Sequence, residues 1–437
     1  MESRLRRSAC TVVLLTTAAF TVLFVTWFHL RFGLNSPPSA TGDEPSYDAI
    51  GWQLAQGNGF REDVTDPVFR RPYDEAAVTN PELMTLADIR SGTVTYRPPL
   101  FPFLIAATDI VFGRQFAAVR ILNVLAITLS GALVVRYLLT DASARTAFIG
   151  MLLFFVIDVR TRLYARAILT EAIAVLLVTL LTLQTVRLCR TRRLSDACVL
   201  GILCGLAMLN RSAFVLWWPG LALGILLLTG REDNATVPIA PETPTSFRRR
   251  VLLVTTMLLT TAVVYAPWAV RNTLILGKFM PMGTQGMMEL SAAFSDKAVE
   301  RQGLWFNQAS DGFYEDVDQP GMTRIEQELA RSAHSRRTAR AWIAAHPQQA
   351  LALVPTKILQ EYRPRSATEW LILICSVTGI IRTRRNLMTK TIVLLHLCNA
   401  FLIGCTWSVE GRFIVPLLFG LHVTAAQAFV PGRNRAD

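Results

Sequence analysis

The feature that most constrains the fold of this chain is a series of apolar runs that approach the length of a membrane-spanning helix. About 20 apolar residues cross the hydrocarbon core of a bilayer. The 437 residues are 52% hydrophobic with a mean hydropathy of +0.37, too apolar for an ordinary soluble enzyme. We therefore expect an all-α polytopic membrane protein of about ten transmembrane helices, at residues 11–32, 119–139, 144–158, 167–188, 195–209, 213–229, 251–269, 369–381, 387–406 and 413–430.

Clusters of arginine lie between these runs and set the expected orientation. Cytoplasmic loops near membrane spans carry an excess of Lys and Arg. With the ten expected spans, all six clusters fall on one side of the membrane. They are Arg4/Arg6/Arg7, Arg136/Arg145, Arg187/Arg190/Arg192/Arg193, Arg248/Arg249/Arg250, Arg382/Arg384/Arg385 and Arg433/Arg435. This arrangement predicts a plasma (inner) membrane protein with both termini in the cytoplasm. Arg160, Arg162 and Arg166 then fall outside, which makes them candidates for function.

The same topology predicts how the chain is organised. A single membrane domain covers residues 1–430, with long extracytoplasmic loops at 33–118 and 271–368, a cytoplasmic linker at 231–250 and a cytoplasmic tail at 431–437. The apolar stretch 101–113 is too short to cross and predicts an interfacial helix, and 324–345 predicts a short amphipathic helix. A cleaved signal peptide is the alternative interpretation of residues 1–32, but the segment before Arg31 lacks a small-residue cleavage site.

The net charge of +12 comes mostly from the cytoplasmic arginines and favours contact with anionic lipid headgroups. A basic chain can also bind nucleic acid, but no basic stripe with interleaved aromatic residues is present. We therefore expect membrane lipids, and no nucleic acid, among the partners.

Charged residues recur at one depth on the expected outer face. Asp43 and Glu44 follow the first span, where charged groups are costly unless they are solvated or used. Ordinary explanations exist for the others: an interfacial Arg often only reaches toward lipid phosphates, and Glu171 could pair with Arg162 or Arg166. The remaining members of this set are Arg97, Arg120, Arg211, Arg271 and Arg412.

An ordered set of motifs carries a family resemblance that runs from residue 43 to residue 416. The chain resembles the GT-C superfamily of membrane glycosyltransferases, in particular bacterial (glycosyltransferase family 39-like) proteins similar to the dolichyl-phosphate-mannose–protein mannosyltransferases and the lipid A aminoarabinose transferase. The matching residues are Asp43-Glu44 with Tyr47 and Gly57, Arg97-Pro98-Pro99-Leu100, Gly113, Arg120, Thr170-Glu171, Arg211, Pro267-Trp268 with Arg271-Asn272, and Arg412 with Pro416.

The resemblance implies a role for individual residues. Asp43 matches the catalytic aspartate of the family, and Glu171 matches a second acidic position at the outer end of a span. Arg97 stands where relatives tend to carry Lys before Pro-Pro, so the charge is kept but the geometry becomes a bidentate fork. The implied activity is transfer of a sugar from a polyprenyl-phosphate donor to a glycan, lipid or protein acceptor.

The chemistry of such a transfer agrees with these residue types. A carboxylate must take the proton of the acceptor, and fixed positive charge must stabilise the departing lipid phosphate. We expect Asp43 to be the base and Glu44 or Glu171 to orient the acceptor. The expected substrate-binding residues are Tyr47, Arg97, Arg120, Arg211, Arg271 and Arg412.

No ligand cluster in the sequence demands a metal, so we expect no required cofactor. Asp316 and Asp318 are the acidic pair that could hold a divalent cation weakly.

Two other classes of function remain open at this level. A transporter or flippase of lipid-linked sugars would place ionisable residues inside its spans, whereas most spans here have apolar centres. A non-catalytic scaffold of envelope assembly would share the topology without the activity. The sequence names neither the sugar nor the acceptor.

Overall fold

The structure is a computed structural model that describes residues 2–79, 85–87, 89–229 and 246–430. The expected tail at 431–437 and residues 231–245 of the expected linker lie outside this range. The described chain is mostly helical, with one two-stranded sheet.

Five of the described helices are long and apolar enough to cross a membrane, and each lies on an expected span. They are α1 (Glu2–Phe32, with its apolar part at Thr11–Phe32), α5 (Phe116–Asp141), α8 (Glu171–Thr191), α11 (Phe247–Leu276) and α18 (Leu387–Cys405). The helix α11 extends beyond the expected end at residue 269, so Arg271 belongs to its last turns rather than to a loop.

The other expected spans fall on shorter helices. These are α6 (Ala144–Leu152) continued by the π-helix η1 (Leu153–Ile157), α9 (Leu194–Asn210), the 3-10 helix η2 (Ser212–Trp217) continued by α10 (Trp218–Leu228), α17 (Ala367–Thr383), and η3 (Arg412–Leu417) continued by α19 (Leu418–Gln427). The described chain is thus a mostly helical bundle with five full-length candidate spans, and the shorter helices pack among them.

Several helices pack closely in pairs, because small residues lie at their contacts. The helices α1 and α5, α8 and α9, α9 and α11, and α17 and α19 lie against each other. Gly379 of α17 shows why a small residue is needed, because a Cβ atom there would lie 1.8 Å from the carbonyl oxygen of Thr424 in α19. Close backbone approach at small residues is the usual way in which membrane helices associate.

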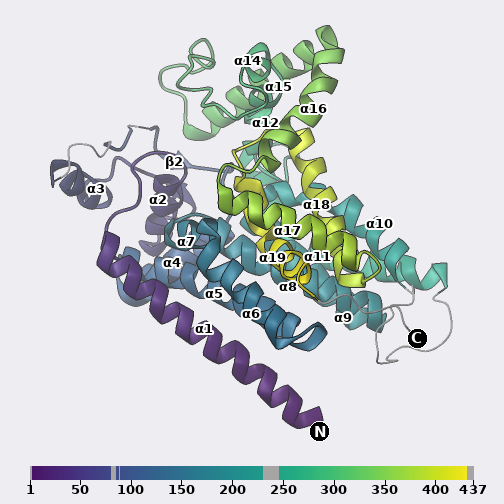
Figure 1. Cartoon of the computed structure of the whole chain (residues 1–437). Helices are drawn as coiled ribbons and strands as arrows, with labels where there is room; N and C mark the ends of the chain where they lie inside the picture. The colour runs from purple at the N-terminus through teal and green to yellow at the C-terminus, as the bar shows by residue number, and fades with distance from the viewer. Residues whose placement is uncertain (1, 80–84, 88, 230–245, 431–437) are drawn as a thin grey trace.

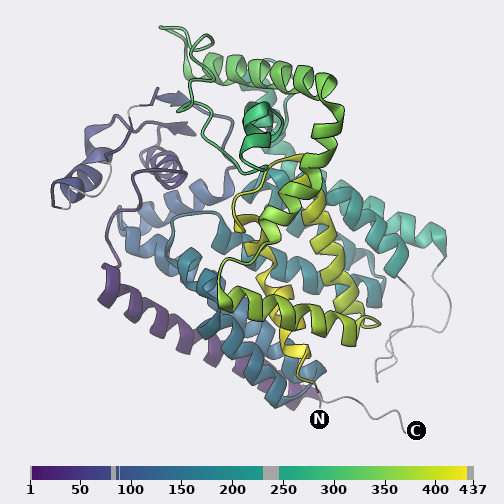
Figure 2. The same ribbon diagram turned by 45° about the horizontal axis from the view of Figure 1, so that its top comes forward.

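The two long loops fold into short elements at one end of the bundle, away from the start of α1 (Figures 1 and 2). The first contains α2 (Glu44–Ala55), β1 (Arg61–Glu62), α3 (Pro67–Thr79), β2 (Gly92–Thr93) and α4 (Leu100–Phe112). The antiparallel pair β1–β2 sets Arg61 opposite Thr93, and α4 packs against α2. The stretch 101–113, expected to form a helix, is therefore helical as α4.

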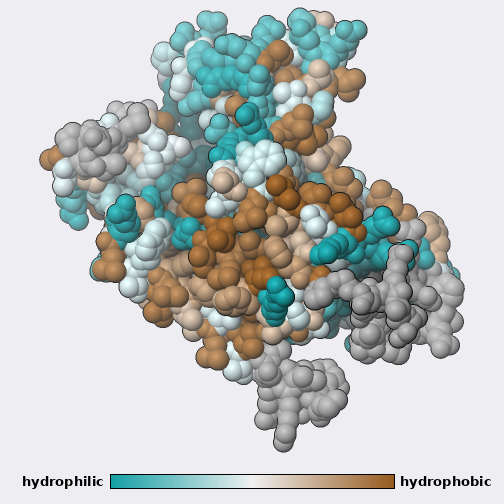
Figure 3. Space-filling model, viewed as in Figure 1, coloured by the Kyte–Doolittle hydropathy of each residue, from teal (hydrophilic) through white to brown (hydrophobic). Residues whose placement is uncertain are grey.

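The second loop contains α12 (Gln285–Met288), α13 (Leu290–Ala293), α14 (Asp296–Glu300), α15 (Arg324–Ala345) and α16 (Pro347–Tyr362). A capping box formed by Thr323 and Glu326 begins α15, so the helix has the bounds expected from the sequence. Figure 3 shows hydrophilic side chains over this loop and a hydrophobic surface over the bundle below it. This contrast is typical of a membrane-embedded body that carries a solvated domain.

Candidate active site

Five of the predicted site residues lie at the ends of helices and converge on one place. Asp43 immediately precedes α2, and Arg97 lies just before α4. Glu171 is the first residue of α8, Arg211 separates α9 from η2, and Arg412 is the first residue of η3. The start of a helix carries free backbone N–H groups and partial positive charge, which favours a carboxylate at the start of α8.

Ion pairs link these residues into one chain. Arg97 Nη2 lies 2.7 Å from Asp43 Oδ1, and Arg412 Nη1 lies 2.7 Å from Asp43 Oδ2. Arg412 also donates through Nε to Glu171 Oε1, which pairs with Arg211 Nη1 at 2.7 Å. Glu171 therefore does not pair with Arg162 or Arg166, the local partners that the sequence suggested. Arg162 binds the carbonyls of Phe155 and Val156 instead.

The chain of ion pairs is open to solvent at Asp43 and closed at Glu171. The Asp43 side chain is 29% exposed, whereas Glu171 is fully buried. Three arginines face two carboxylates, so the group carries one positive charge in excess. A site with unbalanced positive charge beside an accessible carboxylate is suited to an anionic ligand.

Aromatic rings fix the position of Arg97. Its guanidinium lies over the rings of Tyr47 and Tyr96, at 4.9 Å and 4.8 Å from their centroids. Its Nε donates to the hydroxyl of Ser46 at 3.1 Å, and this hydroxyl contacts the hydroxyl of Tyr96 at 2.9 Å. The guanidinium is thus oriented from several sides, and the Tyr47 ring is one of its contacts.

The electrostatics of the site favour an ionised Asp43. Burial alone raises the pKa of Asp43, but the charges and hydrogen bonds of Arg97 and Arg412 outweigh it, and the pKa lies well below its ordinary value. The pKa of Arg97 is raised in turn: burial lowers it, and the charge of Asp43 more than compensates. Asp43 is therefore a carboxylate whose two oxygens are both occupied by arginines.

The structure does not bring every predicted residue into this cluster. Glu44 accepts from the backbone N–H groups of Ser39 at 3.0 Å and Ile168 at 2.6 Å. Arg120 donates to the carbonyls of Leu34, Ser36 and Arg166. Both side chains hold backbone segments beside the site rather than facing its centre.

Arg271 also lies apart from the cluster. It donates to the carbonyls of Phe60 and Val94 and stacks on the rings of Phe60 and Trp268.

Asp318, one of the acidic pair considered for a cation, forms an ion pair with Arg331. Among the described residues, no group of three or more His, Cys, Asp or Glu side chains is placed to hold a metal ion.

Two cavities adjoin each other, and the smaller one reaches the residue next to Arg412. The smaller, of about 150 Å³, is lined by Arg160, Arg363 and Arg365, by the carboxylates of Glu361, Glu369 and Glu410, and by Gly411 next to Arg412. Asp158 holds Arg160 in place through an ion pair of 2.7 Å.

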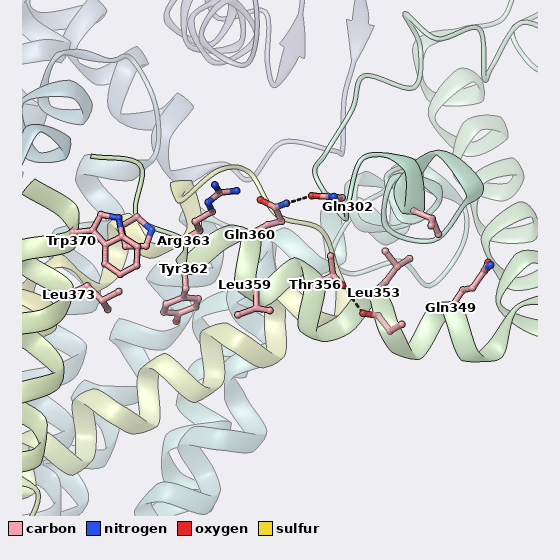
Figure 4. A pocket seen from close by; sticks show the side chains of 13 residues that line it. Gln302, Gln349, Leu353, Thr356, Leu359, Gln360, Tyr362, Arg363, Trp370 and Leu373 are labelled. Atoms are coloured by element: carbon pink, nitrogen blue, oxygen red, sulfur yellow. Dashed lines mark hydrogen bonds between the residues drawn. The ribbon is translucent and has the colours of Figure 1, made fainter. Parts of the chain in front are cut away.

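The larger cavity, of about 840 Å³, is mostly apolar and lies between α14, α16 and α17 (Figure 4). The two cavities share Tyr362, Arg363, Pro364 and Leu373 in their walls. Leu359 and Trp370 point into the apolar part, and Arg363 stands at the boundary, exposed and with no ion pair among the described residues. The apolar groove thus adjoins a charged end that contains three arginines, an arrangement suited to an amphiphile with a polar head.

Sequence reasoning did not identify Ser46, Tyr96 or Arg363. Ser46 and Tyr96 are neighbours of Tyr47 and Arg97 in the chain, so their closeness to the motifs was the available indication. Arg363 lies in the second long loop, where nothing in the residue pattern distinguished it from solvated charges.

Comparisons with known proteins agree with this architecture. Residues 96–241, about a third of the chain, match the family model described as dolichyl-phosphate-mannose-protein mannosyltransferase. No curated protein matches the sequence. The resemblance to GT-C membrane glycosyltransferases is thus confirmed by a family model and by the solved structures that share the fold.

Among those structures is an oligosaccharyltransferase, AglB of Archaeoglobus fulgidus, in complex with an inhibitory peptide and a dolichol-phosphate. It has a TM-score of 0.50 and 15% identity, over 97% of this chain and 50% of AglB. The apo form of the Archaeoglobus fulgidus oligosaccharyltransferase has a TM-score of 0.51 and 15% identity, over 96% of this chain and 50% of the oligosaccharyltransferase. ArnT of Cupriavidus metallidurans bound to undecaprenyl phosphate has a TM-score of 0.36 and 14% identity, over 95% of this chain and 77% of ArnT. The chain spans about half the length of the oligosaccharyltransferases that it matches.

Proposed function

We propose that the protein is an integral-membrane glycosyltransferase that moves a sugar from a polyprenyl-phosphate donor to an acceptor on the extracytoplasmic face. The observation that carries the proposal is Asp43, an accessible carboxylate held at 2.7 Å by both Arg97 and Arg412. Gly411, the neighbour of Arg412, lines the polar cavity that adjoins the apolar groove. The family-model match and the dolichol-phosphate in the complex of the similar oligosaccharyltransferase support a lipid-linked donor.

The donor fits the two adjoining cavities. Its apolar tail would occupy the groove lined by Leu359, Trp370 and Leu373, where burial of apolar surface favours binding. Its phosphate would pass Arg363 and reach the end of the polar cavity next to Arg412. Arginine is suited to this role because its planar fork binds two phosphate oxygens at once.

The reaction requires one bond to break and one to form. The anomeric carbon–oxygen bond breaks, and its electron pair leaves with the phosphate, whose negative charge Arg97 and Arg412 stabilise. An acceptor hydroxyl forms the new bond from the opposite face, which inverts the anomeric centre, and its proton passes to Asp43.

Donor binding would prepare Asp43 for this step. In the free protein both of its oxygens are occupied by arginines, so it is a weak base. A phosphate that binds Arg97 and Arg412 draws part of their charge away from Asp43 and makes the carboxylate more basic. Glu171 keeps Arg412 in place throughout, because its buried carboxylate also binds Arg211.

The decisive experiment is a transfer assay with the purified protein in lipid nanodiscs and a panel of radiolabelled polyprenyl-phosphate sugars. Extracted cell-envelope material serves as the source of acceptors. The wild type should release free polyprenyl phosphate and label the acceptor. Asp43→Asn should abolish transfer and still bind polyprenyl phosphate, and Glu75→Gln, at an exposed carboxylate of α3, should behave as the wild type.

Two outcomes would lead to another function. Movement of lipid-linked sugar across vesicle membranes by wild type and Asp43→Asn alike, with no transfer, would identify a flippase. A protein that shows no transfer and binds no lipid-linked sugar would instead be a scaffold.

A further inference from the structure

A buried carboxylate outside the ion-pair cluster holds the segment that carries Arg412. Glu361 is in the last turn of α16 and is fully buried. Its Oε2 accepts from the Ser408 hydroxyl at 2.7 Å and from the Val409 N–H at 2.8 Å. Its Oε1 accepts from the Phe413 N–H at 2.6 Å. The three donors lie on both sides of Arg412, so one side chain fixes the two ends of this short segment.

The segment needs such support because its backbone is strained. Glu410 has a φ of 54°, in the left-handed region that non-glycine residues rarely adopt, and Gly411 has a φ of 91°. This turn lies between α18 and η3 and directs the Arg412 side chain toward Asp43 and Glu171. Residues in such conformations persist only when their surroundings hold them there.

The same segment is tied to the second long loop. Ser408 donates its N–H to the Gly303 carbonyl at 3.0 Å, and its own carbonyl accepts from the Trp305 N–H at 2.9 Å. Figure 4 shows that the end of α16 contacts the same stretch of this loop, because Gln360 donates to Gln302. The end of α16 thus lies between the loop expected to meet the acceptor and the turn that carries Arg412.

We propose that Glu361 is a positioning residue of the active site, which acts through Arg412 by clamping the segment 408–413 onto the end of α16. The inference rests on the proposed function for its effect on catalysis, whereas the clamp itself does not.

A carboxylate is required for chemical reasons. All three partners of Glu361 are donors, and an ionised carboxylate offers only acceptors. In Glu361→Gln an amide NH₂ must face one of these donors, which leaves that donor unpaired in a buried site. The segment 408–413 then loosens at one end, and Arg412 loses its fixed direction.

The first test needs no activity. In hydrogen–deuterium exchange of the full-length protein in nanodiscs, peptides that cover 408–413 should exchange at least tenfold faster in Glu361→Gln than in the wild type. The matched control is Glu328→Gln, which alters a buried carboxylate that also accepts from a backbone N–H and from hydroxyls, those of Thr95 and Thr284. This control should leave exchange at 408–413 unchanged. Equal exchange in Glu361→Gln and the wild type would overturn the clamp.

The second test is a double-mutant cycle with Arg412→Lys, which keeps the charge but not the fork. Glu361→Gln should lower kcat at least tenfold in the wild-type background and less than threefold when Arg412 is already Lys. Glu328→Gln should lower kcat by the same factor in both backgrounds. Glu361→Asp keeps the carboxylate, so it should lower kcat less than Glu361→Gln does. If Glu361→Gln does not fold, Glu361→Asp takes its place.

The outcomes separate the two proposals. Equal factors for Glu361→Gln in the two backgrounds would mean that Glu361 only stabilises the protein, and the positioning role would be wrong. A wild type that transfers no sugar would remove the proposed function, while the exchange experiment would still decide whether Glu361 holds the segment.

Discussion

Arg412 Nη1 lies 2.7 Å from Asp43 Oδ2, although 369 residues separate the two in the chain. The contact joins the residue before α2, in the first long loop, to the start of η3. Arg97 binds the other oxygen of Asp43, so removal of either arginine should change the chemistry of this carboxylate.

Arg97→Gln should move the acid side of the pH–rate profile to higher pH. In the wild type Arg97 and Arg412 hold the pKa of Asp43 well below 3.8 against the effect of burial. Without Arg97 the pKa rises, so at a given acidic pH more Asp43 is protonated and unable to accept a proton. We expect the acid limb of kcat/KM to shift upward by at least about one pH unit, with kcat lowered about 10²–10³-fold.

The comparison for this prediction is Arg211→Gln. Arg211 binds Glu171 and not Asp43, so its loss should lower activity with a smaller shift of the acid limb. An unchanged limb in Arg97→Gln would show that Asp43 is not the group that titrates.

The apolar cavity predicts a dependence on the length of the lipid. Leu359→Arg places a charge in the groove lined by Leu353, Trp370 and Leu373 (Figure 4). With a long polyprenyl-phosphate sugar the KM should rise at least tenfold, because the tail loses its apolar wall. With a donor of one or two isoprene units, which does not reach the groove, the KM should change less than threefold. Leu359→Met is the control. A similar rise with both donors would place the tail elsewhere.

The helices were largely predictable, and the contacts among charges were not. Runs of apolar residues locate a helix through local composition, and the cap at Thr323 fixes the start of α15 within one residue. The sequence suggests the nearby Arg162 and Arg166 as partners of Glu171, whereas Arg211 and Arg412 are the residues in contact. The packing of distant helices sets these partners, and local sequence does not reveal it. The sequence grouped Arg120 and Arg271 with the site because they share its depth. Depth does not determine which way a side chain points, and both bind backbone carbonyls.

Labelling should establish the orientation of the chain in the membrane. Ser310 lies in the second long loop and Ser246 directly before α11, and both are exposed. In a cysteine-free background, Ser310→Cys should react with an impermeant maleimide in intact spheroplasts, and Ser246→Cys only after lysis. The reverse pattern would place the proposed active site in the cytoplasm and remove the extracytoplasmic acceptor.

Arg120→Met should affect stability much more than catalysis. The Arg120 side chain is almost fully buried and donates to three carbonyls, which join the start of the first long loop and the end of α7 (Val159–Arg166) to α5. Methionine fills a similar volume but leaves these carbonyls without donors, at a cost of about 3 kcal/mol in the free energy of unfolding. We expect a clearly lower Tm of the detergent-solubilised protein, and at low temperature a KM for the donor within threefold of the wild type. Arg97→Met should show the opposite balance, with transfer lost and a smaller change in Tm. A large rise in KM for Arg120→Met at unchanged Tm would instead return Arg120 to the substrate-binding residues that the sequence suggested.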